Sequence, residues 1–496
     1  MVKNKTKHIA VIGSGFSGLS AACYLAKAGY QVTLLEKNDK AGGRGRSYAA
    51  DGFVFDMGPS WYWMPEVMDE FFQDFGKSTK DYFQLKQLDP GYRVFINEGH
   101  VDIPANTDAL SDLFESIEKG AGKALKQFLS EAQFKYEAGL GKFVRKPSHS
   151  IFEFMDIDIL KSLFKIQLFT DMRAHLKKYF KHPQLLQLLE FPVLFLGAKP
   201  QNTPALYSLM NHADLNLGTW YPMGGMAKLP EAMINLAESL GVVIKTNSAV
   251  TKIITNGNAI NKVQGENFSL EVDGVIGSAD YHHIEQTLLP KDKRQYDESY
   301  WESRVMSPSS LLFYVGLNTR VPGLQHHNLF FDQSFDQHAQ EIYDDPQWPS
   351  DPLFYLCCPS KTDNNVAPEG HENLFLLIPV APGLESDEEL REHYWNKMCT
   401  QIQIKTGIDI RNHVVHKRSF AHEEFVSEYN SYKGNAYGLA NTLMQTAFLK
   451  PKMKSKKVAN LFYAGQLTVP GPGVPPSIIS GQLAATELDK TFHSQP

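Results

Sequence analysis

Apolar and polar positions near the N-terminus follow the pattern of a strand, a helix and a second strand. A short, continuous apolar run, typical of a strand buried on both faces of a parallel sheet, occupies residues 8–13 (HIAVIG). Helical spacing follows over residues 16–29 (FSGLSAACYLAKAG), with Gly29 placed to act as a C-terminal cap. A second apolar run covers residues 31–36 (QVTLLE). The pattern predicts a strand–helix–strand unit.

Two later stretches show the same kind of pattern. A Gly-rich loop, an amphipathic helix and a strand are predicted within residues 218–253, and an apolar run with a small-residue exit follows at residues 272–280 (VDGVIGSAD). A strand, a loop rich in glycine and proline, and a helix with small residues on one face are predicted within residues 460–492. The strands of an α/β domain are therefore expected to come from segments far apart in the chain.

The two stretches between these segments differ from each other. The later one contains apolar runs at residues 309–318, 328–332, 352–360 and 373–382, separated by loops rich in Pro, Asp and Asn. These runs predict a mainly antiparallel sheet. The earlier stretch is expected to be mostly helical, with apolar residues spaced three to five apart over residues 151–180. A helix there could lie in a bilayer interface, with its lysines toward lipid headgroups, or pack on the core as an ordinary surface helix.

Composition narrows the class of protein. The chain has 496 residues, 43% of them hydrophobic and 21% charged, which predicts two or three globular domains. A formal net charge of -6 argues against a nucleic-acid partner. No apolar run approaches the roughly 18 residues that span a bilayer, and no signal peptide is recognisable. The four cysteines lack the spacing of a zinc site or disulfide framework, so a cytoplasmic location is expected.

The loop after the first strand has the pattern of a dinucleotide-binding turn. Gly13, Gly15 and Gly18 form G-x-G-x-x-G: the first permits a tight turn, the second lets the backbone approach a pyrophosphate, and the third packs helix on strand. The free N–H groups at the start of the helix then face the phosphates. Glu36 ends the second strand, where a carboxylate can accept hydrogen bonds from the hydroxyls of a ribose.

NAD and FAD both use such a unit, and the neighbouring residues favour FAD. A cationic glycine loop follows the acid at residues 42–45 (GGRG), and residues 52–61 read GFVFDMGPSW. Together with the glycine loop, this continuation resembles the N-terminus of FAD-dependent amine oxidases and phytoene desaturases. Residues 468–481 (TVPGPGVPPSIISG) are similar to the C-terminal signature of bacterial-type phytoene and related carotenoid desaturases. The similarity extends over nearly the whole chain and is most specific at its two ends.

The resemblance implies an α/β fold with a Rossmann-like FAD-binding domain assembled from residues 1–90, 220–290 and 455–496. Residues 91–219 and 291–454 would form an α+β substrate-binding and membrane-facing domain, made of an antiparallel sheet and helices. The expected FAD contacts are Gly13, Gly15, Phe16, Ser17, Gly18, Glu36, Lys37, Gly43, Arg44, Gly58, Pro59, Ser60, Gly465, Gln466, Val474 and Pro475. Many flavin oxidases of the superfamily carry an acid where this chain has Gln466. Backbone N–H groups are therefore the expected flavin anchors at that position.

The implied reaction is desaturation of a C40 isoprenoid. One carbon of a saturated C–C bond beside a polyene would transfer a hydride to the flavin. The neighbouring carbon would then lose a proton. No catalytic residue is assigned and no metal site is expected: the pairs His282–His283 and His326–His327 have neither ligand spacing nor an acid–base partner, and are interpreted as solvated loop or capping residues. Aromatic stretches such as residues 59–75 and 191–210 could line an apolar tunnel or simply fill the core.

Partners and alternatives follow from this chemistry. A carotenoid is insoluble in water, so peripheral attachment to a membrane is expected, with oxygen or a quinone as the electron acceptor. The nearest alternative is a late-pathway carotenoid 3,4-desaturase acting on a hydroxylated or monocyclic carotenoid; a more distant one is an oxidase of amines or porphyrinogens. A non-catalytic prenyl-lipid carrier, similar to Rab GDP-dissociation inhibitors, is disfavoured by the intact glycine loop and Glu36.

Overall fold

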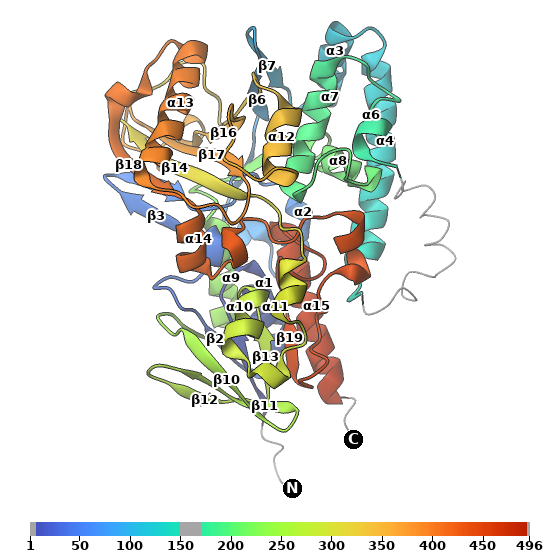
Figure 1. The fold of residues 1–496 in the computed structure, drawn as a ribbon, viewed down its shortest axis with the longest axis vertical. Helices are drawn as coiled ribbons and strands as arrows, with labels where there is room; N and C mark the ends of the chain where they lie inside the picture. The colour runs from blue at the N-terminus through green and yellow to red at the C-terminus, as the bar shows by residue number, and fades with distance from the viewer. Residues whose placement is uncertain (1–5, 149–169, 494–496) are drawn as a thin grey trace.

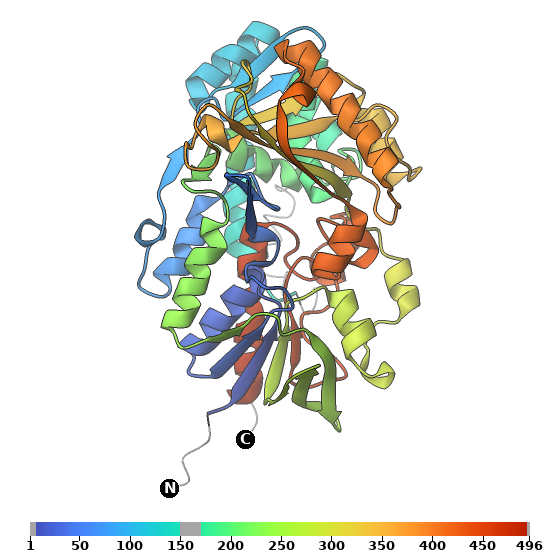
Figure 2. The same ribbon diagram turned by 90° about the vertical axis from the view of Figure 1, so that its left-hand side faces the viewer.

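Two sheets of different kinds organise the molecule. The computed structural model describes residues 6–148 and 170–493. A five-stranded parallel sheet lies in the lower half of Figure 1, and a seven-stranded, mainly antiparallel sheet lies in the upper half. Figure 2 shows the same two halves from the side, with α15 reaching toward the upper one. The α/β fold class expected from the sequence is confirmed.

The parallel sheet has the strand order β19-β13-β1-β2-β9. Its strands are β1 (His8–Ile12), β2 (Gln31–Leu35), β9 (Val243–Lys245), β13 (Gly274–Gly277) and β19 (Leu461–Tyr463). Helices α1 (Phe16–Lys27), α9 (Lys228–Ser239) and α15 (Val474–His493) cover one face. A small sheet of β10 (Val250–Asn256), β11 (Ala259–Gly265) and β12 (Ser269–Glu271) packs on the other. Both faces are thus buried, which explains the continuous apolar runs of these strands.

Helices α1 and α15 pack closely although they lie far apart in the chain. A Cβ atom on Gly481 would approach the carbonyl oxygen of Ser17 to 2.2 Å, and the Ser20 hydroxyl donates to the carbonyl of Ile478 at 2.7 Å. Small residues on the contact faces allow the two backbones to approach this closely. The small-residue face predicted for the C-terminal helix therefore packs on the first helix of the chain.

The seven-stranded sheet has the order β18-β14-β17-β16-β15-β6-β7, and only β15 and β6 are parallel neighbours. Its strands are β6 (Tyr92–Phe95), β7 (His100–Ile103), β14 (Ser309–Leu317), β15 (His327–Phe330), β16 (Phe354–Cys357), β17 (Glu372–Val380) and β18 (Val414–Phe420). Four of them match the predicted apolar runs. Helix α13 (Glu388–Thr406) covers one face; the Asp387 side chain accepts a hydrogen bond from the Leu390 N–H at its start, and Gly407, with a φ of 77°, ends it.

A group of helices packs against the other side of this sheet, as Figure 1 shows at the upper right. These helices are α3 (Thr107–Ile117), α4 (Ala121–Ala138), α6 (Met172–Leu176), α7 (Pro183–Glu190), α8 (Leu209–Leu215) and α12 (Phe335–Tyr343). The remaining elements are β3 (Ser47–Ala50), β4 (Phe53–Asp56), β5 (Leu85–Gln87), β8 (Trp220–Pro222), α2 (Pro65–Gln73), α10 (Tyr281–His283), α11 (Glu298–Glu302) and α14 (His422–Tyr429). The exact division of the chain into two domains stays a prediction.

The long helix expected over residues 151–180 is not continuous. Asp171 has an extended backbone and its side chain accepts a hydrogen bond from the Ala174 N–H at 2.8 Å, so α6 begins at Met172. Met172, Leu176 and Phe180 are fully buried in the core. This part of the segment therefore packs on the core. Residues 149–169 lie outside the described residues, and their interfacial helix stays a prediction.

Candidate cofactor and substrate site

A cavity of about 760 Å³ lies between the two main sheets. Ile12 and Leu35, at the carboxyl ends of β1 and β2, belong to its wall on one side. Leu312 and Leu377, from β14 and β17, belong to its wall on the other. Ligands of open parallel sheets bind outside the carboxyl ends of the strands, so the cavity is where such a ligand is expected.

The three glycines of the first loop have different surroundings. Gly13 has a φ of 97°, and a Cβ there would approach the Ala279 nitrogen to 2.8 Å; a Cβ on Gly18 would approach the Gly13 carbonyl oxygen to 2.0 Å. A Cβ on Gly15 would meet nothing within 4 Å, and its φ of -68° is open to any residue. The fold therefore requires Gly13 and Gly18, whereas Gly15 leaves open space in front of α1.

Glu36 is held against this loop. Its carboxylate accepts hydrogen bonds from the Ser14 N–H at 3.1 Å, from the Ser14 hydroxyl at 2.5 Å and from the Asn38 N–H at 2.9 Å. The residue is only 5% exposed, yet it lines the cavity. Its carboxylate is thus fixed in position beside the loop, where a ribose hydroxyl could donate to its free lone pairs.

The second glycine loop lies directly beside the first. A Cβ on Gly43 would approach the Gly15 Cα to 2.9 Å, so the two loops are in backbone contact. The guanidinium of Arg44 donates to the Ser431 hydroxyl, and its Cζ lies 4.9 Å from the centre of the Tyr429 ring. Burial lowers the pKa of Arg44, and its Nε has no partner among the described residues.

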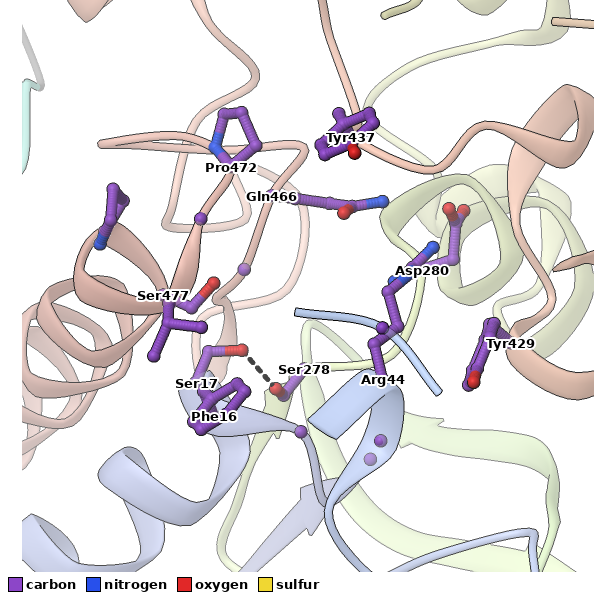
Figure 3. Close-up of a pocket in the computed structure, with 18 of the residues that line it drawn as sticks. Phe16, Ser17, Arg44, Ser278, Asp280, Tyr429, Tyr437, Gln466, Pro472 and Ser477 are labelled. Carbon is purple, nitrogen blue, oxygen red and sulfur yellow. Dashed lines mark hydrogen bonds between the residues drawn. The ribbon is translucent and has the colours of Figure 1, made fainter. Parts of the chain in front are cut away.

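The Arg44 side chain points toward Asp280 in Figure 3. The Asp280 carboxylate accepts hydrogen bonds from the backbone N–H groups of His283 at 3.2 Å and Tyr432 at 3.3 Å. Burial raises the pKa of Asp280, while Arg44 opposes that shift. The cavity wall therefore holds a cation with an unused donor beside a backbone-bound carboxylate, a pairing suited to a polar cofactor.

The C-terminal segment completes this part of the wall. The Gly465 N–H donates to the Ser480 hydroxyl at 3.0 Å, and the Gln466 amide donates to the Asn435 side chain at 3.0 Å. Helix α15 begins at Val474, and residues 470–477 line the cavity before and within its first turn. The Ser17 and Ser278 hydroxyls, 2.7 Å apart, join the first loop to β13 (Figure 3). Three distant segments therefore meet around one space.

Nearly all of the predicted cofactor residues line this cavity. The residues found there are Gly13, Gly15, Phe16, Ser17, Glu36, Lys37, Gly43, Arg44, Gly58, Pro59, Ser60, Gly465, Gln466, Val474 and Pro475. Gly18 lies behind the wall, where it packs α1 on the Gly13 carbonyl. The contacts of these residues with a cofactor stay a prediction.

Some lining residues were missed by the sequence analysis. Ser278 and Asp280 follow β13, and the small-residue exit of that strand was a usable signal because it marks a carboxyl end at the same sheet edge. Tyr429 ends α14 and Tyr437 lies in the loop that follows that helix. Only the tertiary fold brings these two rings to the site.

The remaining wall is largely apolar and aromatic. Its residues include Met57, Trp61, Trp63, Leu140, Met210, Leu312, Phe375, Leu377 and Ile479. Within the described lining, neither the seven-stranded sheet nor α8 contributes a charged side chain. The cavity thus has a polar end, where free N–H groups and a cation suit phosphates. Its other end is apolar and can hold an apolar chain.

The interpretation of the histidine pairs as solvated residues is wrong for His326 and His327, which are buried. The His326 ring bonds Thr362 and the His327 ring bonds the Tyr355 hydroxyl, and both lie with Cys357 in a group whose ligand atoms are within 4.8 Å of one another. This group could hold a metal ion by position. Burial raises the pKa of the Cys357 thiol, which disfavours the thiolate that a metal needs.

The other histidine pair lies closer to the cavity. The His282 ring stacks on the Tyr432 ring with 4.0 Å between the ring centres and contacts Glu298, while its side chain stays partly exposed. His283 lines the cavity, and burial lowers its pKa to about 4. A neutral imidazole is therefore expected there at pH 7.

Comparisons with known proteins point in one direction. The sequence pattern of the family described as flavin containing amine oxidoreductase matches residues 16–489. A carotenoid 3,4-desaturase of Haloarcula japonica is 43% identical over 484 residues, covering 97% of both chains. A zeta-carotene-forming phytoene desaturase of Myxococcus xanthus is 30% identical over 497 residues, covering 99% of this chain and 95% of the other.

Solved structures share the fold at low sequence identity. Cyclohexylamine oxidase from Brevibacterium oxydans matches with a TM-score of 0.61 at 13% identity, covering 99% of this chain and 100% of the other. A putative protoporphyrinogen oxidase from Exiguobacterium matches with a TM-score of 0.62 at 14% identity, with the same coverage. At such identities the likeness concerns the fold alone.

Proposed function

Because the chain belongs to the flavin-containing amine oxidoreductase family, we propose that it is an FAD-dependent desaturase that introduces C=C bonds into a C40 carotenoid. The observation that carries this proposal is the continuity of the cavity. The glycine loop and Glu36 line the same space as the apolar residues of the seven-stranded sheet. A non-catalytic carrier needs no cofactor site. An oxidase of a charged amine needs polar groups at the substrate end of the cavity, which is apolar here.

The described residues fit FAD as the cofactor. The absent side chain of Gly15 leaves open space where a pyrophosphate can reach the N-terminus of α1. The unpartnered Nε of Arg44 offers a donor to a phosphate or to the ring system. Glu36 stands fixed to accept from the ribose. These residues, with Lys37, Gly43, Gly58, Pro59, Ser60, Gly465, Gln466, Val474 and Pro475, form the proposed contact set.

The chain's own residues supply positioning rather than acid–base chemistry. Bound FAD provides a hydride acceptor, and the substrate loses a hydride from one carbon and a proton from the next. Trp61, Phe375 and Leu377 hold an apolar chain in one orientation and shield a cationic polyene from bulk water. The proton leaves from a carbon beside a delocalised cation, where it is acidic enough to be taken by water or the cofactor.

Sequence identity favours a late-pathway substrate. The 43% identity to a 3,4-desaturase, against 30% to the phytoene desaturase, supports dehydrogenation at the 3,4 position of a hydroxylated or monocyclic carotenoid. Phytoene, the substrate first expected from the sequence, becomes the second candidate. Both substrates need the same cofactor geometry and differ in the tunnel length and the end pocket that they require.

Expression in pigment-accumulating cells tests the proposal. The chain is produced in cells that accumulate phytoene and in cells that accumulate late carotenoids, and the pigments are separated by chromatography with absorbance detection. We expect a longer chromophore, with absorbance shifted to the red, in the late-carotenoid cells. A change only in the phytoene cells would favour the second candidate, and no change in either would overturn the desaturase assignment.

A matched control shows that the cofactor site is responsible. In a Gly15→Asp variant, the added carboxylate would enter the open space before α1 and repel the phosphates. This variant is expected to leave the pigments of both strains unchanged. Purified wild-type protein, but not the variant, is expected to show flavin absorbance near 450 nm.

Peripheral membrane attachment is part of the proposal, with oxygen or a membrane quinone reoxidising the flavin. Within the described residues, no helix is long and apolar enough to cross a bilayer. Met444 is 74% exposed and Leu449 is 38% exposed, and between them the Thr446 hydroxyl lies 3.3 Å from that of Tyr207, which lines the cavity. These exposed apolar side chains suit a cavity mouth that contacts lipid.

Vesicle flotation tests this attachment. The double variant Met444→Asp, Leu449→Asp is expected to float with lipid vesicles several-fold less than the wild type while keeping its flavin absorbance. Equal flotation of the two proteins would contradict the assignment of this segment to the membrane surface.

A further inference from the structure

Lys450 carries a buried ammonium group that has no hydrogen-bond partner in the described part of the chain. The residue follows a short helical turn at residues 447–449 and is only 3% exposed. Among the described residues, no hydrogen-bond acceptor lies within reach of its Nζ. An isolated buried cation costs several kcal/mol, and it is kept only where something compensates it. Within residues 6–148 and 170–493, the fold therefore holds a positive charge at this point that no side chain neutralises.

This ammonium lies against the loop that precedes α15. The Lys450 Nζ is 2.9 Å from the position that a Cβ atom on Gly471 would occupy, and the Asn441 side-chain oxygen is 3.6 Å from the same point. Gly471 and Asn441 both line the cavity. Burial lowers the pKa of Lys450 to about 8, so the group remains mostly protonated at pH 7. The missing counter-charge is thus to be sought in the cavity.

Lys450 lies against a different segment of the chain from the first glycine loop. The phosphates are expected at the glycine loop of β1 and α1, next to Gly43 and Arg44, and these residues already supply N–H groups and a cation there. Lys450 instead adjoins Gly471, which lines the cavity from the C-terminal segment. A second cation at this end suits a group that becomes negative during the reaction.

We propose that the ammonium of Lys450 compensates the negative charge that the flavin ring acquires when it accepts a hydride. The inference rests on FAD occupying this cavity. Neutral oxidised flavin plus one hydride gives a ring with one more negative charge, while the substrate, having lost that hydride and then a proton to water, gains a double bond. Charge near the ring is one of the means by which a protein tunes flavin electronics. Lys450 is accordingly a positioning residue for charge, not an acid or base.

The test measures the midpoint potential of the bound flavin in the FAD-loaded, full-length protein, by equilibration with a reference dye. In Lys450→Met, the equilibrium constant for flavin reduction is expected to fall at least tenfold, which is a shift of about 30 mV or more to negative potential for a two-electron couple. In Lys450→Arg, which keeps the charge, that constant is expected to stay within about threefold of wild type.

Lys452→Met is the matched control. Lys452 lies two residues away and its Nζ donates to the carbonyl oxygens of Ser148 and Phe448, so the variant removes the same charge from a partnered position. Its midpoint potential is expected to equal that of the wild type. An equal shift of the midpoint potential in both variants would mean that the potential responds only to the net charge of the protein, and would overturn the proposal.

Two further readouts separate the alternatives. Because Lys450→Met removes an unpaired buried charge, the thermal midpoint of the FAD-free variant is expected to be unchanged or raised. If Lys450→Met misfolds, Lys450→Gln replaces it in all measurements. Weaker FAD binding at an unchanged potential would assign Lys450 to the phosphates and overturn the proposal. Because no carotenoid enters these measurements, they are independent of the proposed substrate.

Discussion

Gly15 allows the fold and the cofactor to be tested separately. Its φ of -68° is open to any residue, and no atom lies within 4 Å of the point that a Cβ atom would occupy, so alanine fits the protein itself. Gly15 is also the N-cap of α1, where replacement of glycine by alanine costs less than about 1 kcal/mol. The thermal midpoint of FAD-free Gly15→Ala is therefore expected to stay close to that of the wild type.

The effect on FAD binding is expected to be much larger. The added methyl group projects into the open space before α1 and keeps the pyrophosphate from the N–H groups of the first turn. Loss of one or two hydrogen bonds to a charged group removes about 2–4 kcal/mol of binding free energy, which raises the dissociation constant about 30- to 1000-fold. Titration of the FAD-free protein, followed by quenching of flavin fluorescence, measures this constant.

Gly18→Ala is the informative comparison. A Cβ there meets the Gly13 carbonyl oxygen at 2.0 Å, so this variant is expected to lose stability of the FAD-free protein, by roughly 1–3 kcal/mol. If Gly15→Ala bound FAD as tightly as the wild type, the space before α1 would not be the pyrophosphate site, and the reasoning from the open glycine would fail.

Three other predictions follow from buried contacts. Gly481→Ala would force its Cβ against the Ser17 carbonyl oxygen and is expected to lower the free energy of unfolding by about 1–3 kcal/mol, measured by urea titration; an unchanged midpoint would contradict the close packing of α1 and α15. Met210→Glu places a carboxylate in the apolar wall and is expected to abolish pigment conversion while the 450 nm absorbance persists; loss of both would mean that the residue supports the fold instead. Burial raises the pKa of Asp214, which accepts a hydrogen bond from Tyr92, to about 7. The folded state therefore keeps a proton that the unfolded state loses above about pH 4. The free energy of unfolding is expected to fall by up to about 4 kcal/mol between pH 4 and 7. Asp214→Asn should flatten this slope in urea titrations at several pH values, and an equal slope would exclude Asp214 as its source.

The sequence was most informative where local geometry and function impose the same pattern. The G-x-G-x-x-G turn with Glu36 predicted both the strand–helix–strand unit and a wall of the cavity, because the turn needs glycines at fixed spacing. The strands of the parallel sheet were equally visible, since burial on both faces makes them continuously apolar. By contrast, β6 and β7 were missed within a stretch expected to be helical, because only their pairing with distant strands makes them part of a sheet.

Site residues outside motifs depend on tertiary contacts. Lys450 reads as one of several lysines in a basic stretch, and only the fold shows that its ammonium is buried. His327 is buried because β15 pairs with β16 and brings its ring to Tyr355. The apolar periodicity expected to run through Asp171 fails because a side-chain cap competes with helix continuation there. Such outcomes depend on packing partners that no local window contains.

The contact between α1 and α15 also has a consequence for biosynthesis. The ribosome makes about 450 residues between β1 and β19, which takes on the order of 20 to 90 s at cellular elongation rates. During that interval the nascent glycine turn exists without the neighbours that enclose it. The cofactor can therefore bind only after α15 has left the ribosome. Chains truncated before residue 461 are expected to contain no flavin and to depend on chaperones.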